Sequence, residues 1–469
     1  MIAKAGVPAI SRSPCAAGGP DDDDARREFA DLLERRDVSA VFQPLVNLHT
    51  GEIVALEALA RGPESSQFAS PIALFTAARR AGRTAELDWA CRAAAFKAFY
   101  AGGVSPAMSL FINIEPESLN EKCPEDLAPL VSKAESVLRV FVEINERALA
   151  SDPAGVLATV DRARAKGWGI AIDDVGTSHA PVAMLPVVNA DLVKLDRKIL
   201  KDASPRDSAT VIRSVLRYVE TTGAALLVEG IESEADAQWA RALGATYGQG
   251  FHLGRPGPLR DTYPVPRAPV PLIEFPAAGL EFSSPFEVFE GEAHQRMDRE
   301  LLGQLILMAA DAPRSTGTKP VFLVCVDKNQ GLSGEVMEHL LELAGGALLF
   351  VIFGIAMPAE PAPGARGVGV RRLDPMAEEW FLIVLSDQAP AAVFGQSTGS
   401  GLFDVVFTQS AELVHGIAHH LIRRIPGPGQ GNHALPIALL DVLDDDTDLA
   451  APVSPVKQGG WRGRLGKHG

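Results

Sequence analysis

Short apolar runs alternate with stretches of helical periodicity through the first half of the chain. The runs Val41–Leu48 and Ile53–Leu59 predict two strands joined by a turn at His49–Glu52. Further short apolar runs follow, and most of them precede a helix-like stretch such as Pro153–Lys166. Strands that alternate with helices in this way predict parallel βαβ units. These further runs are Ser109–Ile114, Val140–Ile144, Gly169–Asp174, Asp191–Leu195, Ala224–Glu229 and Tyr247–Phe251.

Eight predicted strands within roughly 230 residues fit a closed barrel, since a (β/α)8 barrel takes about 250 residues. An open, doubly wound sheet is the alternative that the same pattern leaves. Two helices between the second and third strands have clear end signals. One begins at Pro71 behind Ser70 and ends at Gly82, and the other covers Ala85–Tyr100.

The second half of the chain predicts a smaller α/β unit after a stretch rich in proline. Proline lacks a backbone N–H and fixes φ, so residues 256–284 are typical of a semi-rigid linker. Helices are expected near Gly334–Ala344 and Leu402–Arg424, and strands at Val321–Val326, Leu348–Ile355, Val368–Arg371, Phe381–Ser386 and Ala391–Phe394. The predicted division is a disordered tail at 1–24, a barrel at 25–260, a linker at 261–284, an α/β domain at 285–425 and a disordered tail at 426–469. The acid run Asp21–Asp24 is expected to precede a helix that begins near Ala25.

The charge balance narrows the classes of partner. Lys and Arg number 44 against 59 Asp and Glu, a net charge of −15. Nucleic acids and anionic membranes attract basic surfaces, so neither is expected as a partner. The four cysteines are scattered, no apolar leader precedes Pro8, and the longest apolar stretch, Ala347–Pro358, is too short for the ~20 residues of a membrane span. These features predict a soluble, cytoplasmic protein.

Polar residues end almost every predicted strand of the barrel. In such a barrel the C-terminal ends of the strands converge on one mouth, and a charge inside an apolar run needs a counter-charge or a metal. The set holds carboxylates, two amides and a lysine but no His or Cys, which favours Mg²⁺ or Mn²⁺. Two such ions suit attack of water on a phosphate ester, and Arg61 offers a fork for the phosphate. The set comprises Glu57, Asn113, Glu143, Asp173, Asp174, Lys194, Glu229 and Gln249.

A series of sequence blocks from Ala25 to Pro256 has the order of a known family. The blocks are Phe42-Gln43-Pro44-Leu45-Val46, Glu57-Ala58-Leu59-Ala60-Arg61, Phe111-Ile112-Asn113-Ile114, Val142-Glu143-Ile144-Asn145-Glu146, Ala171-Ile172-Asp173-Asp174-Val175-Gly176-Thr177, Val193-Lys194-Leu195-Asp196, Val228-Glu229-Gly230-Ile231-Glu232 and Gly248-Gln249-Gly250-Phe251. Together they resemble the EAL domain, the bacterial cyclic di-GMP phosphodiesterase family.

This resemblance implies a modified TIM-like (β/α)8 barrel whose first strand is antiparallel. It also implies hydrolysis of cyclic di-GMP to linear pGpG with two Mg²⁺ or Mn²⁺ ions. By resemblance, Lys194 contacts the attacking water and Glu146 steadies the loop after Asp174. The metal ligands would be Glu57, Asn113, Glu143, Asp173, Asp174 and Glu229, of which Glu57 and Glu229 also count as catalytic with Lys194, and the substrate would contact Gln43, Arg61 and Gln249.

The loop after Asp174 departs from the family pattern. Residues Val175–Val182 lack the family's second glycine, its aromatic residue and its serine pair, and Asn145 replaces a usual threonine. The departures leave two alternatives open, a catalytically inactive cyclic di-GMP receptor and an interaction module that no longer binds nucleotide. In the family this loop also supports dimers, so a homodimer stays open too. His179 in the loop is expected to be exposed, and His415, His419 and His420 are expected on a solvated helix face.

The second domain resembles, more loosely, the DICT sensory domain found with cyclic di-GMP enzymes and two-component systems. The similarity lies in Ser284–Val288, Lys319–Leu323 and Trp380–Leu385, followed by Ala391-Ala392-Val393. A generic accessory domain is the alternative, because these are mostly core-strand patterns. The resemblance implies signal transduction, in which an unidentified ligand or protein acts on the barrel through the linker.

Overall fold

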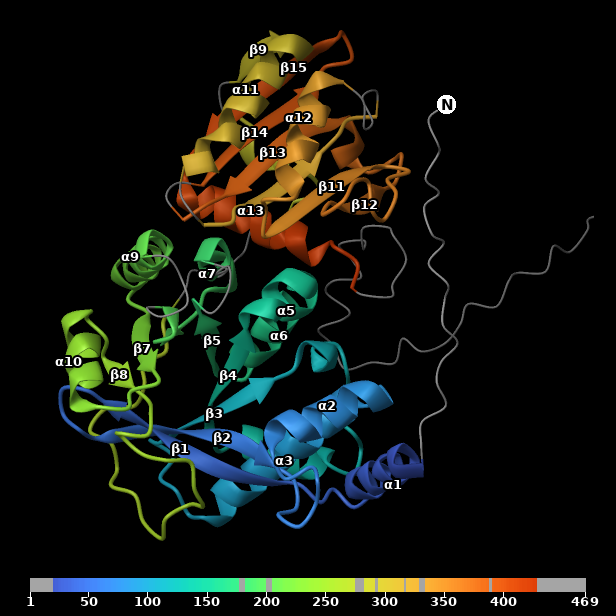
Figure 1. Cartoon of the computed structure of the whole chain (residues 1–469). Coiled ribbons are helices and arrows are strands. Elements are labelled where there is room, and N and C mark those ends of the chain that lie inside the picture. Colours follow the sequence, from blue (N-terminus) through green and yellow to red (C-terminus); the bar gives the residue numbers. More distant parts are fainter. Residues whose placement is uncertain are drawn as a thin grey trace, which may run out of the picture.

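The computed structural model describes residues 20–176, 182–199, 205–274, 282–291, 294–315, 318–328, 334–387 and 390–427. Two units are visible, a barrel formed by the first half of the chain and a second sheet formed by the later half (Figure 1). The expectations for most of the two tails and for His179 fall outside the described residues. Among the helices that are described, none combines the length and the apolar character that crossing a lipid bilayer requires.

The first unit is a closed eight-stranded barrel, as predicted, which excludes the open sheet. Strand β1 runs antiparallel to both of its neighbours, β2 and β8, and the remaining neighbours are parallel. Both expectations, the barrel and the reversed first strand, are therefore confirmed. The strands are β1 (Ser39–Asn47), β2 (Ile53–Arg61), β3 (Ser109–Ile114), β4 (Arg139–Asn145), β5 (Gly169–Val175), β6 (Leu192–Asp196), β7 (Ala225–Glu229) and β8 (Tyr247–Gly248).

Helices surround the barrel, and their ends follow the capping residues. The Ser70 side chain accepts from the backbone N–H of Ala73 at the start of α2, and Gly82 ends that helix with φ +65°. Helix α1 begins at Pro20, earlier than expected, so the acid run lies in its first turns rather than before it. The elements are α1 (Pro20–Glu34), α2 (Pro71–Ala81), α3 (Thr84–Ala101), η1 (Pro116–Ser118), α4 (Ala128–Glu135), α5 (Glu146–Ser151), α6 (Pro153–Ala165), η2 (Val182–Met184), α7 (Leu185–Val188), α9 (Pro205–Thr222) and α10 (Glu234–Ala242).

Part of the proline-rich segment closes the barrel at the N-terminal end of its parallel strands. Val270 is fully buried and packs in the same apolar cluster as Phe111 and Phe141. Its carbonyl accepts from Arg139 Nη2 at 2.7 Å, and Asp191 Oδ1 accepts from the backbone N–H of Ile273 at 2.8 Å. The interpretation of this stretch purely as a linker is therefore corrected. An extended segment can place an apolar side chain, here that of Val270, over an apolar cluster that the strands alone would leave exposed to water.

The second unit is a seven-stranded sheet in the order β12-β11-β10-β13-β14-β15-β9. Alternate residues of β13 enter two different apolar cores, because successive side chains of a strand point to opposite faces. Helices α11 and α12 cover one face and α13 the other. The elements are η3 (Pro285–Phe289), β9 (Gln295–Asp298), α11 (Arg299–Asp311), η4 (Ala312–Ser315), β10 (Val321–Cys325), α12 (Glu335–Ala344), β11 (Leu349–Ile355), β12 (Arg366–Val370), η5 (Pro375–Glu378), β13 (Glu379–Leu385), β14 (Ala391–Ser397), β15 (Leu402–Thr408) and α13 (Ala411–Arg423).

The single helix expected at Leu402–Arg424 is wrong. The first part is strand β15, where buried Phe403 and Val405 alternate with more exposed residues. Helix α13 begins only after Ser410, whose side chain accepts from the backbone N–H of Leu413. The two-residue alternation before Ser410 is a strand signal, and the helical spacing starts after it.

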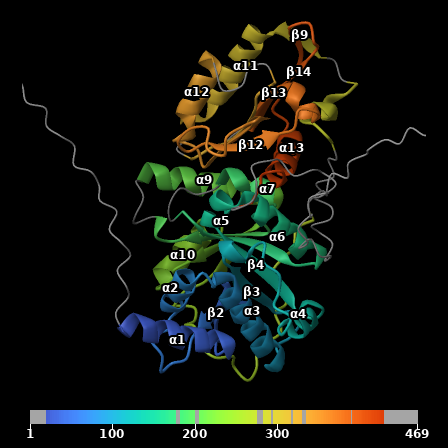
Figure 2. The same cartoon turned by 90° about the vertical axis from the view of Figure 1, so that its right-hand side faces the viewer.

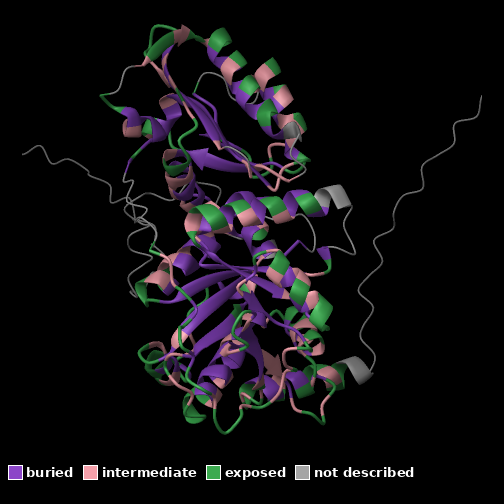
Figure 3. Cartoon of the chain, turned by 90° about the vertical axis from the view of Figure 1, so that its left-hand side faces the viewer, coloured by how far each residue is buried: buried purple, intermediate pink, exposed green. Residues whose placement is uncertain are grey.

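Helix α13 joins the two units. It packs against α6 and α7 of the barrel on one side and against β13 and β14 on the other (Figure 2). His419 is buried rather than solvated, a correction, and its Nδ1 lies 3.1 Å from the carbonyl oxygen of Val187 in α7. Beyond this helix, Ser214 Oγ of α9 donates to Asp387 Oδ2 at 2.5 Å. Figure 3 shows that buried residues dominate the strands of both units.

Candidate active site

The C-terminal ends of the barrel strands bring the predicted polar residues to one rim. Strand register places Asn113 beside Glu143, Asn145 beside Asp173, and Asp196 beside Glu229. Each polar side chain follows or interrupts an apolar run that fixes its strand in the barrel wall. The three residues Glu57, Glu143 and Lys194 are almost fully buried. The convergence that the strand pattern predicted is therefore present.

Lys194 lies at the centre of four carboxylates, which we call the acid rim: Glu57, Glu143, Asp173 and Glu229. The Lys194 Nζ atom is 2.7 Å from Glu143 Oε1, 2.8 Å from Glu229 Oε1, 3.1 Å from Asp173 Oδ1 and 3.5 Å from Glu57 Oε2. Burial alone would lower the pKa of Lys194, but the surrounding acids, Asp173 and Glu143 above all, raise it well above its ordinary value. The ammonium group is therefore kept charged.

Two amides hold Glu57 in place. Gln249 Nε2 donates to Glu57 Oε2 at 2.6 Å, and Asn113 Nδ2 donates to Glu57 Oε1 at 3.2 Å. Burial works to raise the pKa of Glu57, yet Lys194 and these two amides outweigh it and leave the pKa lowered. Glu57 is thus an ionised carboxylate whose two oxygens are both oriented.

The other acids of the rim carry a surplus of negative charge. Burial, helped by the charge of Glu57, raises the pKa of Glu143 well above its ordinary value. Burial also raises the pKa of Glu229 to about 8. One lysine cannot neutralise four neighbouring carboxylates, so the site favours a further cation or protons.

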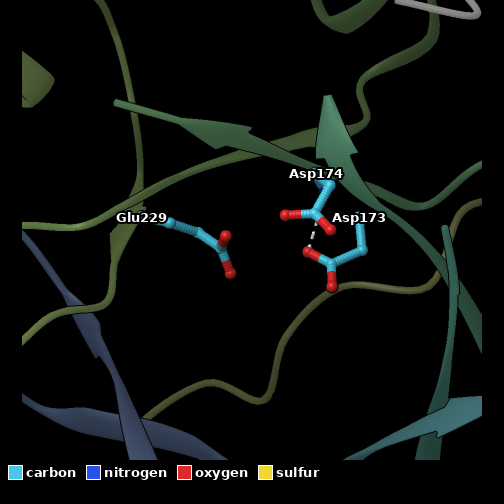
Figure 4. A group of neighbouring side chains, drawn as sticks. All are labelled: Asp173, Asp174 and Glu229. Carbon is cyan, nitrogen blue, oxygen red and sulfur yellow. Dashed lines mark hydrogen bonds between the residues drawn. The ribbon is translucent and has the colours of Figure 1, made fainter. Parts of the chain in front are cut away.

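Three carboxylates meet at the edge of the rim. One oxygen each of Asp173, Asp174 and Glu229 lies within 4.8 Å of those of the other two. Figure 4 shows Glu229 extending toward the two aspartates from the opposite side. The backbone of Asp174 has φ +60°, and its N–H donates to Asp173 Oδ1 at 2.9 Å. This left-handed turn directs two successive carboxylates toward the same space.

The donor set fits hard divalent cations. Its atoms are carboxylate and amide oxygens, the ligands that Mg²⁺ and Mn²⁺ prefer. The Oε2 atom of Glu143 and the Oε1 atom of Gln249 are buried and accept no hydrogen bond from any described residue. Buried acceptors without a donor are costly, so a cation or a water that it binds would satisfy them.

An open cavity of about 320 Å³ adjoins the acid rim. Gln43 lines it, and its Nε2 donates to the carbonyl of Gly254 at 3.1 Å. Arg61 does not line this cavity; its Nη1 donates to the neighbouring carbonyl of Ala60 at 2.8 Å. The lining residues are Gln43, Glu57, Leu59, Asp173, Glu229, Gly230, Glu232, Gln249, Gly250 and Phe251.

Phe251 and Glu232 line the cavity but were not singled out from the sequence. Phe251 is 52% exposed, and the Arg255 guanidinium carbon lies 4.3 Å from the ring centre. An exposed aromatic ring backed by a cation is a stacking platform for a flat base. The available signal was a large aromatic residue directly after Gln249-Gly250, at the end of an apolar run.

Asn145 and Glu146 begin helix α5 directly beyond β4. The Asn145 side chain accepts from the backbone N–H of Ala148 at 3.0 Å, so this departure from the family pattern is a good helix cap. Glu146 is buried as the first residue of the helix. Residues 177–181 of the altered loop lie outside the described part of the chain, so the expectation that Glu146 steadies this loop stays a prediction.

Comparison with known proteins shows which family the sequence of the barrel resembles. The family model described as "EAL domain" matches residues 26–256. A protein named probable cyclic di-GMP phosphodiesterase PdeB, from Escherichia coli, is 29% identical over 49% of this chain and 45% of its own length. The bifunctional diguanylate cyclase/cyclic di-GMP phosphodiesterase MucR of Pseudomonas aeruginosa is 27% identical over 49% of this chain and 35% of its own. The chain spans less than half of the length of these relatives.

Solved structures give similar matches. BlrP1 of Klebsiella pneumoniae, in a complex with manganese and cyclic di-GMP, is 25% identical over 47% of this chain and 56% of its own, with a TM-score of 0.41. The FimX EAL domain of Pseudomonas aeruginosa, bound to cyclic di-GMP, is 20% identical over 52% of this chain and 100% of its own, with a TM-score of 0.44.

Proposed function

We propose, from the premise that the barrel of this chain is an EAL domain, that it hydrolyses cyclic di-GMP to linear pGpG with Mg²⁺ or Mn²⁺. The observation that carries this proposal is Lys194 within four carboxylates, beside the Asp173–Asp174 turn. The relatives named for this activity support the choice of substrate.

The residues of the rim have separate tasks in this proposal. Two ions would be held by Glu57, Asn113, Glu143, Asp173, Asp174 and Glu229. Bound ions supply charge stabilisation at the phosphate and lower the pKa of water. Lys194 keeps its proton and orients the attacking water by donating a hydrogen bond to it, which requires one of the three carboxylates within 3.1 Å of Nζ to give up its contact.

The cavity side of the site binds the dinucleotide. Gln249 and Arg61 contact phosphate oxygens, which requires the Arg61 guanidinium to leave the Ala60 carbonyl. Gln43 lies near one guanine, and the Phe251 ring stacks on a base. This assignment divides the mouth into an ionic part for phosphate and a flat part for bases.

A catalytically inactive receptor for cyclic di-GMP is the second candidate function. The loop after Asp174 favours it, because this loop lacks the glycine, aromatic and serine residues of the family pattern. The six proposed metal ligands and Lys194 favour hydrolysis.

The test uses the purified full chain with cyclic di-GMP and Mn²⁺, and chromatography for pGpG. We expect conversion that stops with EDTA and returns when Mn²⁺ is restored. Calorimetry with Ca²⁺ measures binding separately. Binding without conversion would instead assign the receptor function, and absence of both would leave only an interaction module.

We also propose that the second domain regulates the barrel through helix α13. Helix α7, which α13 contacts, lies between the Asp173–Asp174 turn and strand β6, which carries Lys194. Helix α9 follows β6, and Asp387 of the second domain holds it through Ser214. Movement of the second domain therefore acts on both connections that border Lys194.

Removal of the Asp387 carboxylate, which accepts from Ser214 of the barrel and from Thr318 of its own domain, tests this coupling. Asp387→Ala, which deletes the acceptor of Ser214, is expected to change turnover while the melting temperature shifts little. Asp404→Ala, which deletes a surface pair with Arg296 far from the barrel, is the matched control. The resemblance to a DICT domain, a homodimer and a cytoplasmic location stay predictions.

A further inference from the structure

A second cavity, of about 570 Å³, lies in the second domain and is rich in arginine. It lies where α13 ends and where the chain enters η5. We call it the arginine cavity, and it shares no lining residue with the cavity at the acid rim. Its lining residues are Ser283, Arg371, Arg372, Leu373, Asp374, Pro375 and Arg424.

The charge of this cavity is opposite to that of the chain. Three guanidinium groups face one carboxylate, Asp374, although the whole chain has a net charge of −15. Arg371 and Arg372 are exposed and pair with no carboxylate of the described residues. A local excess of positive charge within an acidic protein attracts anions to this one place.

Arg424 is the residue of the cavity whose side chain is buried and held in place by neighbouring groups. It is only 2% exposed, and its Nη2 donates to Asp374 Oδ2 at 2.6 Å. Its Nη1 lies 3.3 Å from the carbonyl oxygen of Ser283 and also contacts Met376 Sδ. Its Nε is buried and has no hydrogen-bond partner among the described residues. A buried donor without an acceptor is costly, and a ligand oxygen would satisfy it.

We propose that the arginine cavity binds a small oxyanion, the phosphate or carboxylate group of a metabolite. Guanidinium groups present paired N–H donors whose geometry matches both kinds of oxyanion. Leu373 is 98% exposed on the cavity lining and offers apolar contact to the rest of the ligand. The volume falls within the roughly 300–1,000 Å³ of small-molecule sites and exceeds what a free phosphate fills.

The position of the site allows a bound ligand to influence the barrel through helix α13. Arg424 is the C-cap residue of α13, and the same helix contacts α6 and α7. A bound oxyanion therefore adds contacts at the end of helix α13, which packs against both units. The binding itself does not depend on hydrolysis in the barrel, so the two proposals fail separately.

The test measures binding of inorganic phosphate and of citrate to the full chain by calorimetry and thermal melting. Metal is first stripped from the acid rim with EDTA, which is removed before the titration because it is itself a polycarboxylate, and ionic strength is matched with sodium chloride. We expect each probe to raise the melting temperature and to give a measurable heat of binding. Arg371→Ala and Arg372→Ala are expected to weaken binding about tenfold each, because each removes a charge-assisted hydrogen-bond donor. Arg80→Ala, which removes an exposed arginine of α2, is the matched control.

The outcomes separate the ligand classes and decide the proposal. Tighter binding of phosphate assigns a phosphorylated ligand, and tighter binding of citrate assigns a polycarboxylate. Arg424→Lys keeps the charge but removes Nε, so a folded variant is expected to bind more weakly than the wild type. If neither probe binds, or if the Arg371 and Arg372 variants bind both probes as the wild type does, the proposal is wrong.

Discussion

The acid rim of the barrel and Glu379 of the second domain both remove carboxyl groups from water, but in different ways. At the rim, Lys194 lies among four carboxylates, and Asp173 and Glu229 keep 14% and 20% of their side chains exposed. Glu379 is completely buried in the second domain, where the backbone N–H of Phe286 donates to its Oε1 at 3.2 Å. Burial raises the pKa of Glu379 to about 7.

The difference shows how a surplus of buried charge is resolved. At the rim a dissolved cation can reach the surplus carboxylates, so the arrangement is suited to binding a metal. At Glu379 the carboxyl is sealed, so it is neutralised by a proton. Unneutralised carboxylates that solvent ions can reach therefore indicate a binding site. A carboxyl group that is sealed from solvent instead makes the stability of the fold depend on pH.

The largest effect is expected from a substitution at Glu57, which tests whether the acid rim binds the catalytic metal. Glu57→Ala is expected to abolish hydrolysis, a loss of more than about 10³-fold, because it removes an oriented, ionised ligand of the catalytic metal. Formation of pGpG with Mn²⁺ is the measurement. Glu64→Ala, at an exposed position, is the control. Turnover retained in Glu57→Ala would mean that the site is misplaced.

The next effect concerns the single cation of the rim. Lys194→Ala is expected to lower kcat by about 10²- to 10³-fold and to leave nucleotide affinity nearly unchanged, because Lys194 acts on the water. Steady-state kinetics and calorimetry separate the two quantities. Lys97→Ala, which removes an exposed lysine of α3, serves as control. An equal loss of rate and affinity would contradict the role of Lys194 beside the water.

The smallest effect is expected at Glu379, the buried carboxyl group of the second domain. Between pH 4.5 and about 7 the folded state holds a proton on Glu379 that the unfolded state releases, so stability falls as pH rises through this range. Glu379→Gln is neutral at every pH and is expected to raise the free energy of unfolding at pH 8 by up to about 3 kcal/mol, with little change at pH 4.

Chemical denaturation at both pH values measures this effect. The control is Glu412→Gln at an exposed position of α13, for which no pH-dependent gain is expected. A Glu379→Gln variant that is destabilised equally at pH 4 and pH 8 would show that packing, not protonation, governs this position.

Local patterns predicted the barrel and the site, but not the contacts between distant segments. Strand ends such as Asn113 and Glu229 were recognisable because parallel strands share one rim. The burial of Val270 and His419 depends on surfaces contributed by other parts of the chain, which no local periodicity records. The alternation of strand β15 is short and runs almost directly into the helical spacing that follows Ser410, so the pattern alone does not separate the two elements. The charge state of Lys194 requires the distances to its four neighbours.

Helix α13 limits how freely this protein can be divided. Its buried face includes Val414, Ile417 and Leu421, and these residues belong to one apolar core that extends from the barrel helices into the second sheet. A barrel expressed alone would present the uncovered faces of α6 and α7 to water. The accessory domain thus cannot be exchanged like an independent module, and any natural recombination of these two units must carry matching surfaces on both sides of α13.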